Sequence, residues 1–303
     1  MAHACVSVRR ARPLLGTFVE ISVCGDDQSR IDRALDAAFD TVAKVHGLMS
    51  FHQADSDVGR LNREAATRPV SVHPWTFQVL QTALALHDRT AGLFDITIAP
   101  VLQDRGLLPR SRSDRGPGPR RIAMAETVAL LADRRIRVRG GTTIDLGGIA
   151  KGFAVDRAAD ALKSHDIACG LVNAGGDLFA FGKHSHSVHI RDPRDPRRCL
   201  CRVDVAEEAM ASTGIGFDPL RSVRTSGSAI IDPRSLQPVD RIIGATVRAA
   251  SCMIADALTK IVMIDPTGAS LLLDHHNASA MMVLADGEAR VTPNWKGAAS
   301  LAA

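Results

Sequence analysis

The stretch "IDLGGIAKGFAVDRAADAL", residues 144–162, constrains the fold of this chain more than any other. Strand-like residues lead into two adjacent glycines, and apolar residues at helical spacing follow. Because glycine has no Cβ, the backbone at Gly147 and Gly148 can approach a ligand closely. The helix start near Ala150 and the ammonium of Lys151 predict a seat for an anion such as phosphate. The spacing fits neither GxGxxG nor GxxxxGK[ST], and such a turn alone is as often structural as functional.

Strand and helix patterns alternate around this turn. "GTFVEISV" has the alternation of a strand, and helical spacing follows over residues 29–49, in "TFQVLQTALALHDRTAG" and over residues 150–164. Short strands are predicted for "TTIDL", "GLVNAGG", "LFAFG", "SVHIRD" and "CRVDVA", whereas "SFHQADSDVGRLNR" is polar and irregular. Later "GATVRAA", the helical "MIADALTKIVMI" and "ASAMMVLADGE" repeat the order strand, helix, strand. With no fixed repeat and no clear linker, we expect a single α+β unit.

The composition narrows the class of protein. A chain of 303 residues with 46% hydrophobic content has enough apolar surface for a globular core. A formal charge of +4, from 37 basic and 33 acidic residues, gives no reason to expect nucleic-acid binding. Residues 105–121, dense in Arg, Pro and Gly, predict a flexible basic loop, which either steers an anion or is simply solvated.

The cysteines and the apolar segments indicate the cellular compartment in which the protein is expected. The six cysteines lack the spacing of zinc or redox motifs, so free thiols in a reducing compartment are expected. No transmembrane segment is predicted, and no secretory signal precedes the first strand. We therefore expect a cytoplasmic protein, or an exported one only if the given N-terminus has been trimmed.

Seven segments together resemble the FAD:protein FMN transferase (ApbE) family. They are "PLLGTFVEI", "MSFHQADSDVGRLN", "FDITIAPVLQDRG", "IDLGGIAKGFAVDRAADAL", "LVNAGGDLFAFG", "IIDPRSLQPV" and "ADALTKIVMI", in the family's order and approximate spacing. The resemblance implies one ApbE-like domain over residues 12–290, with mixed sheets and packed helices. It also implies that the chain binds FAD with Mg²⁺, splits the pyrophosphate, and moves FMN onto a Thr or Ser hydroxyl of a client flavoprotein. AMP would be released.

The resemblance assigns the FAD-contacting residues one position at a time. Leu15 stands where the family has Met, and His52 stands at an aromatic position usually filled by Tyr; a core leucine and a surface histidine are the alternatives. Asp145 matches a carboxylate that contacts FAD, and Phe94 could equally be plain core. The full set is Leu15, His52, Leu93, Phe94, Asp95, Asp145, Lys151 and Ile231.

The metal motif departs from the family pattern. Relatives hold Mg²⁺ with a backbone carbonyl at the position of Gly148 and with the acid and hydroxyl of "ADALxT". Here Asp256 keeps the acid, but Lys260 replaces the hydroxyl four residues later, and Thr259 lies one residue earlier. The resemblance therefore implies Gly148, Asp256 and Thr259 as metal ligands. Because an ammonium cannot ligate a metal, Lys260 could instead pair with Asp256 and displace the ion.

The acceptor loop also departs from the family's "HxIDPxTG". In "SAIIDPRSL", Ala229 stands in place of the histidine thought to act as general base, and Ser235 and Leu236 replace Thr-Gly. Alanine cannot take a proton, so no catalytic residue is assigned. A group near "RTSGS" is one candidate to replace the histidine as general base. Two functions stay open: a transferase, or an FAD-binding maturation factor or carrier without turnover. A nicotinamide oxidoreductase is disfavoured because no Rossmann fingerprint is present.

Overall fold

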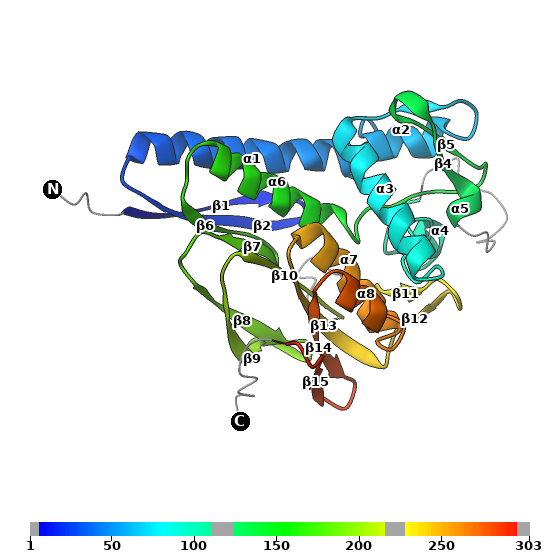
Figure 1. Ribbon diagram of the computed structural model, residues 1–303. Coiled ribbons are helices and arrows are strands. Elements are labelled where there is room, and N and C mark those ends of the chain that lie inside the picture. The colour runs from blue at the N-terminus through cyan, green and yellow to red at the C-terminus, as the bar shows by residue number, and fades with distance from the viewer. Residues whose placement is uncertain (1–5, 111–123, 216–227, 296–303) are drawn as a thin grey trace.

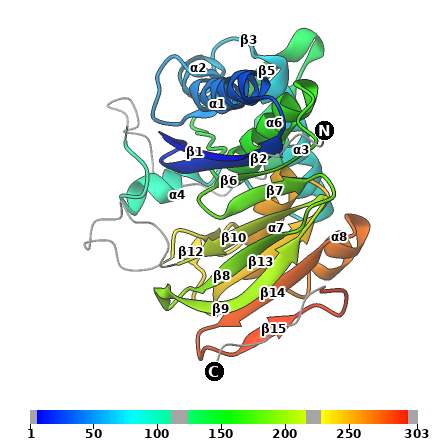
Figure 2. The same ribbon diagram turned by 90° about the vertical axis from the view of Figure 1, so that its left-hand side faces the viewer.

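A large antiparallel sheet organises the molecule (Figures 1 and 2). The computed structural model describes residues 6–110, 124–215 and 228–295. Figure 2 shows the strands in the order β1-β2-β6-β7-β10-β13-β14-β15, from β1 at the top to β15 at the bottom. Their bounds are β1 (Val6–Leu14), β2 (Thr17–Gly25), β6 (Cys169–Ala174), β7 (Asp177–Phe181), β10 (Glu208–Gly214), β13 (Ile242–Ala249), β14 (Ser279–Leu284) and β15 (Ala289–Val291).

Three helices cover one face of this sheet. They are α1 (Gln28–Met49), α6 (Ala150–Ser164) and α7 (Cys252–Ile264), and in Figure 1 α1 and α6 run side by side above the strands. Helix α1 packs on β1 and β2, α6 on β6 and β7, and α7 on β10 and β13. The alternating buried residues of β2, Val19, Ile21 and Val23, show that one side of the strand faces this core. None of the helices in the described ranges is both long and apolar enough to cross a bilayer.

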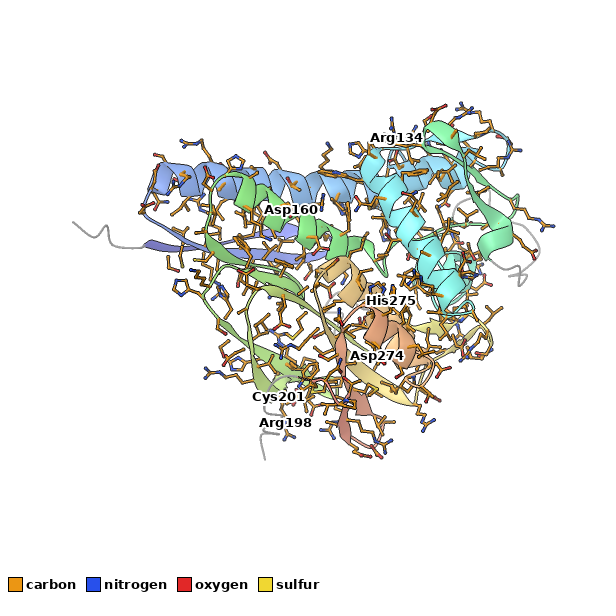
Figure 3. The ribbon with its side chains drawn as sticks, viewed as in Figure 1. Arg134, Asp160, Arg198, Cys201, Asp274 and His275 are labelled. Atoms are coloured by element: carbon orange, nitrogen blue, oxygen red, sulfur yellow. The ribbon has the colours of Figure 1, made fainter. Side chains whose placement is uncertain are left out.

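A two-stranded ribbon covers the opposite face. It consists of β8 (His186–Asp192) and β9 (Asp195–Val205), and encloses a second apolar cluster against the sheet. Strand β7 serves both cores, because Leu178 and Ala180 face the ribbon whereas Phe181 belongs to the helix side. Cys201, labelled on the ribbon in Figure 3, lies with its Sγ 3.9 Å from Met281 Sδ.

The remaining elements belong neither to the large sheet and its three helices nor to the ribbon. They are α2 (Asp57–Glu64), β3 (Val70–Ser71), α3 (Pro74–Arg89), α4 (Ala99–Asp104), α5 (Met124–Thr127), β4 (Val128–Leu130), a 3₁₀ turn (Ala132–Arg134), β5 (Arg135–Val138), β11 (Ile231–Asp232), β12 (Gln237–Pro238) and α8 (Ser270–His275). Strands β3, β5 and β4 form a small sheet of their own. The Arg89 side chain of α3 contacts His275 of α8, which Figure 3 labels.

The structure confirms the predicted α+β class and most predicted elements, with two corrections. The predicted strand "TTIDL" is wrong, because residues 142–146 pair with no strand. Instead, the Asn62 side chain bonds both backbone groups of Ile144, at 2.8 and 2.9 Å. The segment predicted as irregular contains α2, whose start is capped by Ser56 accepting the Gly59 N–H at 2.8 Å. Of the predicted basic loop, residues 111–121 lie outside the described residues.

Helices α6 and α7 approach each other closely at Gly152. A Cβ added there would lie 2.2 Å from the Cys252 carbonyl oxygen and 2.8 Å from Asp256 Cβ. Both distances are far below any van der Waals contact, and the nearest atom belongs to backbone. The absence of a side chain at Gly152 therefore sets the separation of the two helices.

Replacing Gly152 should test this separation. We expect Gly152→Ala to lower the free energy of unfolding by about 1–3 kcal/mol, because the added methyl group has to push α7 away. Gly140→Ala is the matched control, since a Cβ there would meet nothing within 4 Å. Urea denaturation of both variants checks this, and equal stability of the two would contradict the packing described.

Candidate functional site

The turn before α6 is held by neighbours from distant parts of the chain. The Asn62 side chain bonds both backbone groups of Ile144, and the Asp145 N–H donates to the Ile96 carbonyl oxygen at 2.8 Å. Phe94 lies under the turn, with its ring 3.6 Å from the point where a Cβ on Gly148 would stand. The glycine backbone is thus fixed between α2 and residues 93–97.

The Asp145 carboxyl folds back over this turn. Burial raises its pKa, and the backbone N–H groups of Gly147 and Leu146 and the nearby His52 oppose the shift. A Cβ on Gly147 would lie 2.9 Å from Asp145 Oδ2, so the missing side chain leaves room for the carboxyl. The carboxyl group of Asp145 therefore lies beside the predicted anion-binding turn and can make a polar contact with a ligand there.

Helices α6 and α7 cap each other. Asp156 of α6 accepts the Cys252 N–H at 2.8 Å, the Met253 N–H at 2.9 Å and the Ser251 hydroxyl at 2.8 Å. In return, Asp256 Oδ2 of α7 accepts the Gly152 N–H in the first turn of α6 at 3.1 Å. Each helix thus supplies a carboxylate to the N-terminus of the other. The helix dipole makes each N-terminus partly positive, so a negative charge there stabilises the helix.

A four-residue charge cluster forms around this crossing. Lys151 pairs with Asp177, and Lys260 pairs with Asp256. Both carboxylate side chains are fully buried, while the lysine side chains are 34% exposed for Lys151 and 15% for Lys260. We call these four residues the charge cluster. It brings two ammonium groups to the side of the glycine turn.

The cluster's two acids differ in their electrostatics. Burial would raise the pKa of Asp256, but the ammonium groups of Lys260 and Lys151 outweigh it and lower the pKa. The pKa of Asp177 is raised by burial and by the charge of Asp256, which the two lysines only partly offset. For Lys151, the carboxylates of Asp177 and Asp256 outweigh burial and raise the pKa. The Lys151 ammonium is therefore kept charged.

A Gly-Gly turn places Asp177 in the cluster. Gly175 and Gly176 adopt φ of +67° and +104° between β6 and β7, so that Ala174 pairs directly with Asp177. The Asn173 side chain accepts the Gly176 N–H at 2.9 Å. No sequence pattern pointed to Asp177, Asn62, Asp156 or Gly152 as site residues. For Asp177, the signal was an acid directly after two glycines at the start of an apolar strand.

The predicted FAD residues fall into two groups. Phe94, Asp145 and Lys151 gather at the glycine turn, and His52 lies close enough to influence Asp145. Leu93 and Phe94 are buried, and Asp95 Oδ1 accepts both the N–H and the hydroxyl of Thr97, at 2.7 and 2.6 Å. Burial raises the pKa of Asp95 despite these two bonds.

Leu15 and Ile231 belong to other elements than the glycine turn. Leu15 occupies the two-residue turn between β1 and β2 with φ of +57°, a conformation that a leucine rarely adopts. Ile231 is buried in a small separate cluster with Val101 and Leu102. For both residues the predicted contact with FAD stays a prediction.

Two of the three predicted metal ligands, Asp256 and Thr259, do not fit Mg²⁺ as they stand. Asp256 Oδ1 is taken by the Lys260 ammonium, and Oδ2 by the Gly152 N–H. The Thr259 hydroxyl donates to the Asp256 carbonyl oxygen at 2.7 Å and shares a 2.7 Å hydrogen bond with Thr213. Of the four carboxylate oxygens of Asp177 and Asp256, only Asp177 Oδ1 has no hydrogen-bond partner among the described residues. In the described ranges, no three His, Cys, Asp or Glu side chains group as a metal site either.

The acceptor loop presents no side-chain base at the predicted position. Ala229 is exposed, beside the buried Ser228, whose Oγ accepts the Ile230 N–H at 3.0 Å. Leu236, where the family has glycine, keeps a left-handed backbone with φ of +59°. Most of "RTSGS" lies outside the described residues, so the replacement base expected there is not placed.

Comparisons with known proteins agree on one family. A model described as the ApbE family matches residues 15–283. An FAD:protein FMN transferase of Vibrio cholerae is 28% identical over 251 residues, covering 78% of this chain and 72% of that protein. One from Klebsiella pneumoniae is 24% identical, covering 90% and 83%. The crystal structure of the ApbE protein from Thermotoga maritima has a TM-score of 0.83 at 25% identity, covering 95% of this chain and 97% of that one.

Removing the Asp156 cap should weaken the crossing on which the site is built. We expect Asp156→Ala to lower the free energy of unfolding by about 2 kcal/mol, because it leaves the first N–H groups of α7 without their acceptor. Asp160→Ala, one turn further along α6 and labelled in Figure 3, is the control. Its carboxylate is about half exposed and pairs only with Arg157 among the described residues, so a change of about 0.5 kcal/mol is expected. Equal losses in thermal unfolding would argue against the reciprocal caps.

Proposed function

The chain belongs to the ApbE family, and from that premise we propose that it is an FAD:protein FMN transferase. Its substrates are FAD and a client flavoprotein that offers a Thr or Ser hydroxyl. The hydroxyl oxygen attacks the phosphorus of the FMN half, the P–O bond to AMP breaks, and the hydroxyl proton passes to a base. The sequence relatives named for this activity support the proposal.

One observation carries the proposal: the glycine turn opens α6 directly beside two charged ammonium groups. Phosphoryl transfer depends mainly on positioning and on neutralising charge on the phosphates. Gly147 and Gly148 let backbone approach a pyrophosphate, and Lys151 and Lys260 supply positive charge at the same place. Phe94 and Asp145 lie at the same turn and His52 lies near Asp145, so these residues would contact the flavin or the adenosine half.

A second function is favoured by the exposed methyl group of Ala229. Without a base at this position, the chain could bind FAD as a maturation factor or carrier and transfer FMN slowly or not at all. Both functions require the FAD pocket, and turnover separates them.

The first test concerns FAD affinity. Purified protein should bind FAD more tightly than FMN or NAD, and Asp145→Ala should weaken FAD binding about ten- to hundredfold through loss of a charge-assisted hydrogen bond. Asp160→Ala is the control, because ten residues of helix, about 15 Å, separate it from the start of α6. Calorimetry checks this; no FAD binding by the wild-type protein would remove both functions.

The second test concerns the missing base. Transfer of FMN to a peptide with an acceptor Thr should be slow in the wild type, and Ala229→His should speed it by about 10²- to 10⁴-fold, the usual contribution of a positioned general base. Ala229→Asn is polar but not basic at neutral pH and should leave the rate unchanged. A histidine variant no faster than the asparagine variant would show that the base belongs elsewhere.

A further inference from the structure

Lys260 lies between the glycine turn and Asp256 rather than in solvent. Its Cε is 3.8 Å from the point where a Cβ on Gly148 would stand, and its ammonium donates to the Asp256 carbonyl oxygen at 3.0 Å and to the Asp256 carboxylate. The side chain is only 15% exposed. A fixed positive charge therefore stands at the backbone of the turn.

This charge and a divalent metal ion compete for the same oxygen. Asp256 Oδ1 receives the ammonium, and a cation placed on Oδ1 would meet a like charge at hydrogen-bond distance. The other oxygen, Oδ2, caps α6 through Gly152 and cannot move away without freeing that N–H. The Thr259 hydroxyl points to the Asp256 carbonyl and to Thr213. Local geometry thus favours the ammonium over the ion.

We infer that Lys260 replaces the divalent cation in this chain, so that FAD binds without metal through the Lys260 ammonium. The inference rests on the proposed function, which supplies FAD as the ligand. Asp256 takes two of the three N–H donors of Lys260 among the described residues, and the third can donate to a pyrophosphate oxygen. Lys151, which pairs with Asp177, supplies the second positive charge of the cluster.

The decisive experiment titrates wild-type protein with FAD, once in EDTA and once in excess Mg²⁺, by calorimetry. The inference predicts dissociation constants that agree within about twofold, since no interaction is gained from the ion. A parallel titration with Mn²⁺ alone, followed by electron paramagnetic resonance of the free ion, should show no binding at stoichiometric concentration.

Two variants locate the effect at Lys260. In EDTA, Lys260→Met should weaken FAD binding about ten- to hundredfold, the usual worth of a charge-assisted hydrogen bond, and Mg²⁺ should restore little. Lys260→Thr returns an oxygen ligand to this position, so its FAD affinity should fall in EDTA and recover with Mg²⁺, and it should bind Mn²⁺. Lys183→Met is the control, because Lys183 is exposed and its loss changes only net charge. Thermal unfolding confirms that each variant is folded.

The outcomes separate the inference from the proposed function. FAD binding that requires Mg²⁺ in the wild type, together with stoichiometric Mn²⁺ binding, would overturn the inference and leave the transferase proposal standing. An affinity unchanged in both Lys260 variants would also overturn it. Absence of FAD binding under every condition would overturn the proposed function and the inference with it.

Discussion

The reciprocal capping of α6 and α7 is the interaction on which the rest of the structure depends. Asp156 and Asp256 each accept N–H groups at the start of the other helix, and Gly152 lets the helices come close enough for both. The partial positive charges at the N-termini of α6 and α7 would otherwise repel each other, and the two carboxylates neutralise them. The helices in turn pack on β6, β7, β10 and β13, so the crossing fixes the glycine turn relative to the sheet.

Asp256 takes part both in the capping of α6 and in the electrostatics of the site. One carboxylate oxygen holds α6 and the other holds the Lys260 ammonium, so that the acid stays ionised inside the core. Removing one member of a buried pair leaves the other uncompensated, which is far costlier than losing a surface pair. The ammonium groups of the charge cluster are therefore held in place by contacts within the protein. Such preorganisation lowers the cost of binding an anion.

Local patterns predict the long elements well and the tertiary contacts poorly. The apolar spacing of α1, α6 and α7 is strong over several turns, and the i, i+4 spacing of Asp256 and Lys260 allowed their pairing to be foreseen. Helix α2 spans only eight residues and carries few apolar ones, so its segment looked irregular. Asp177 and Asn62 meet their partners across 26 and 82 residues, and no local pattern contains that information. Ala229 could be identified as a departure only because family motifs surround it.

A crystal structure of the FAD complex grown with Mn²⁺ tests the central claim most directly, because manganese reports its own position by anomalous scattering. We expect pyrophosphate density at the glycine turn within hydrogen-bond distance of Lys260 Nζ, with Asp256 still bonded to Lys260 and no anomalous peak on its carboxylate. A manganese ion bound to Asp256 and the Gly148 carbonyl, with the Lys260 side chain turned away, would contradict it.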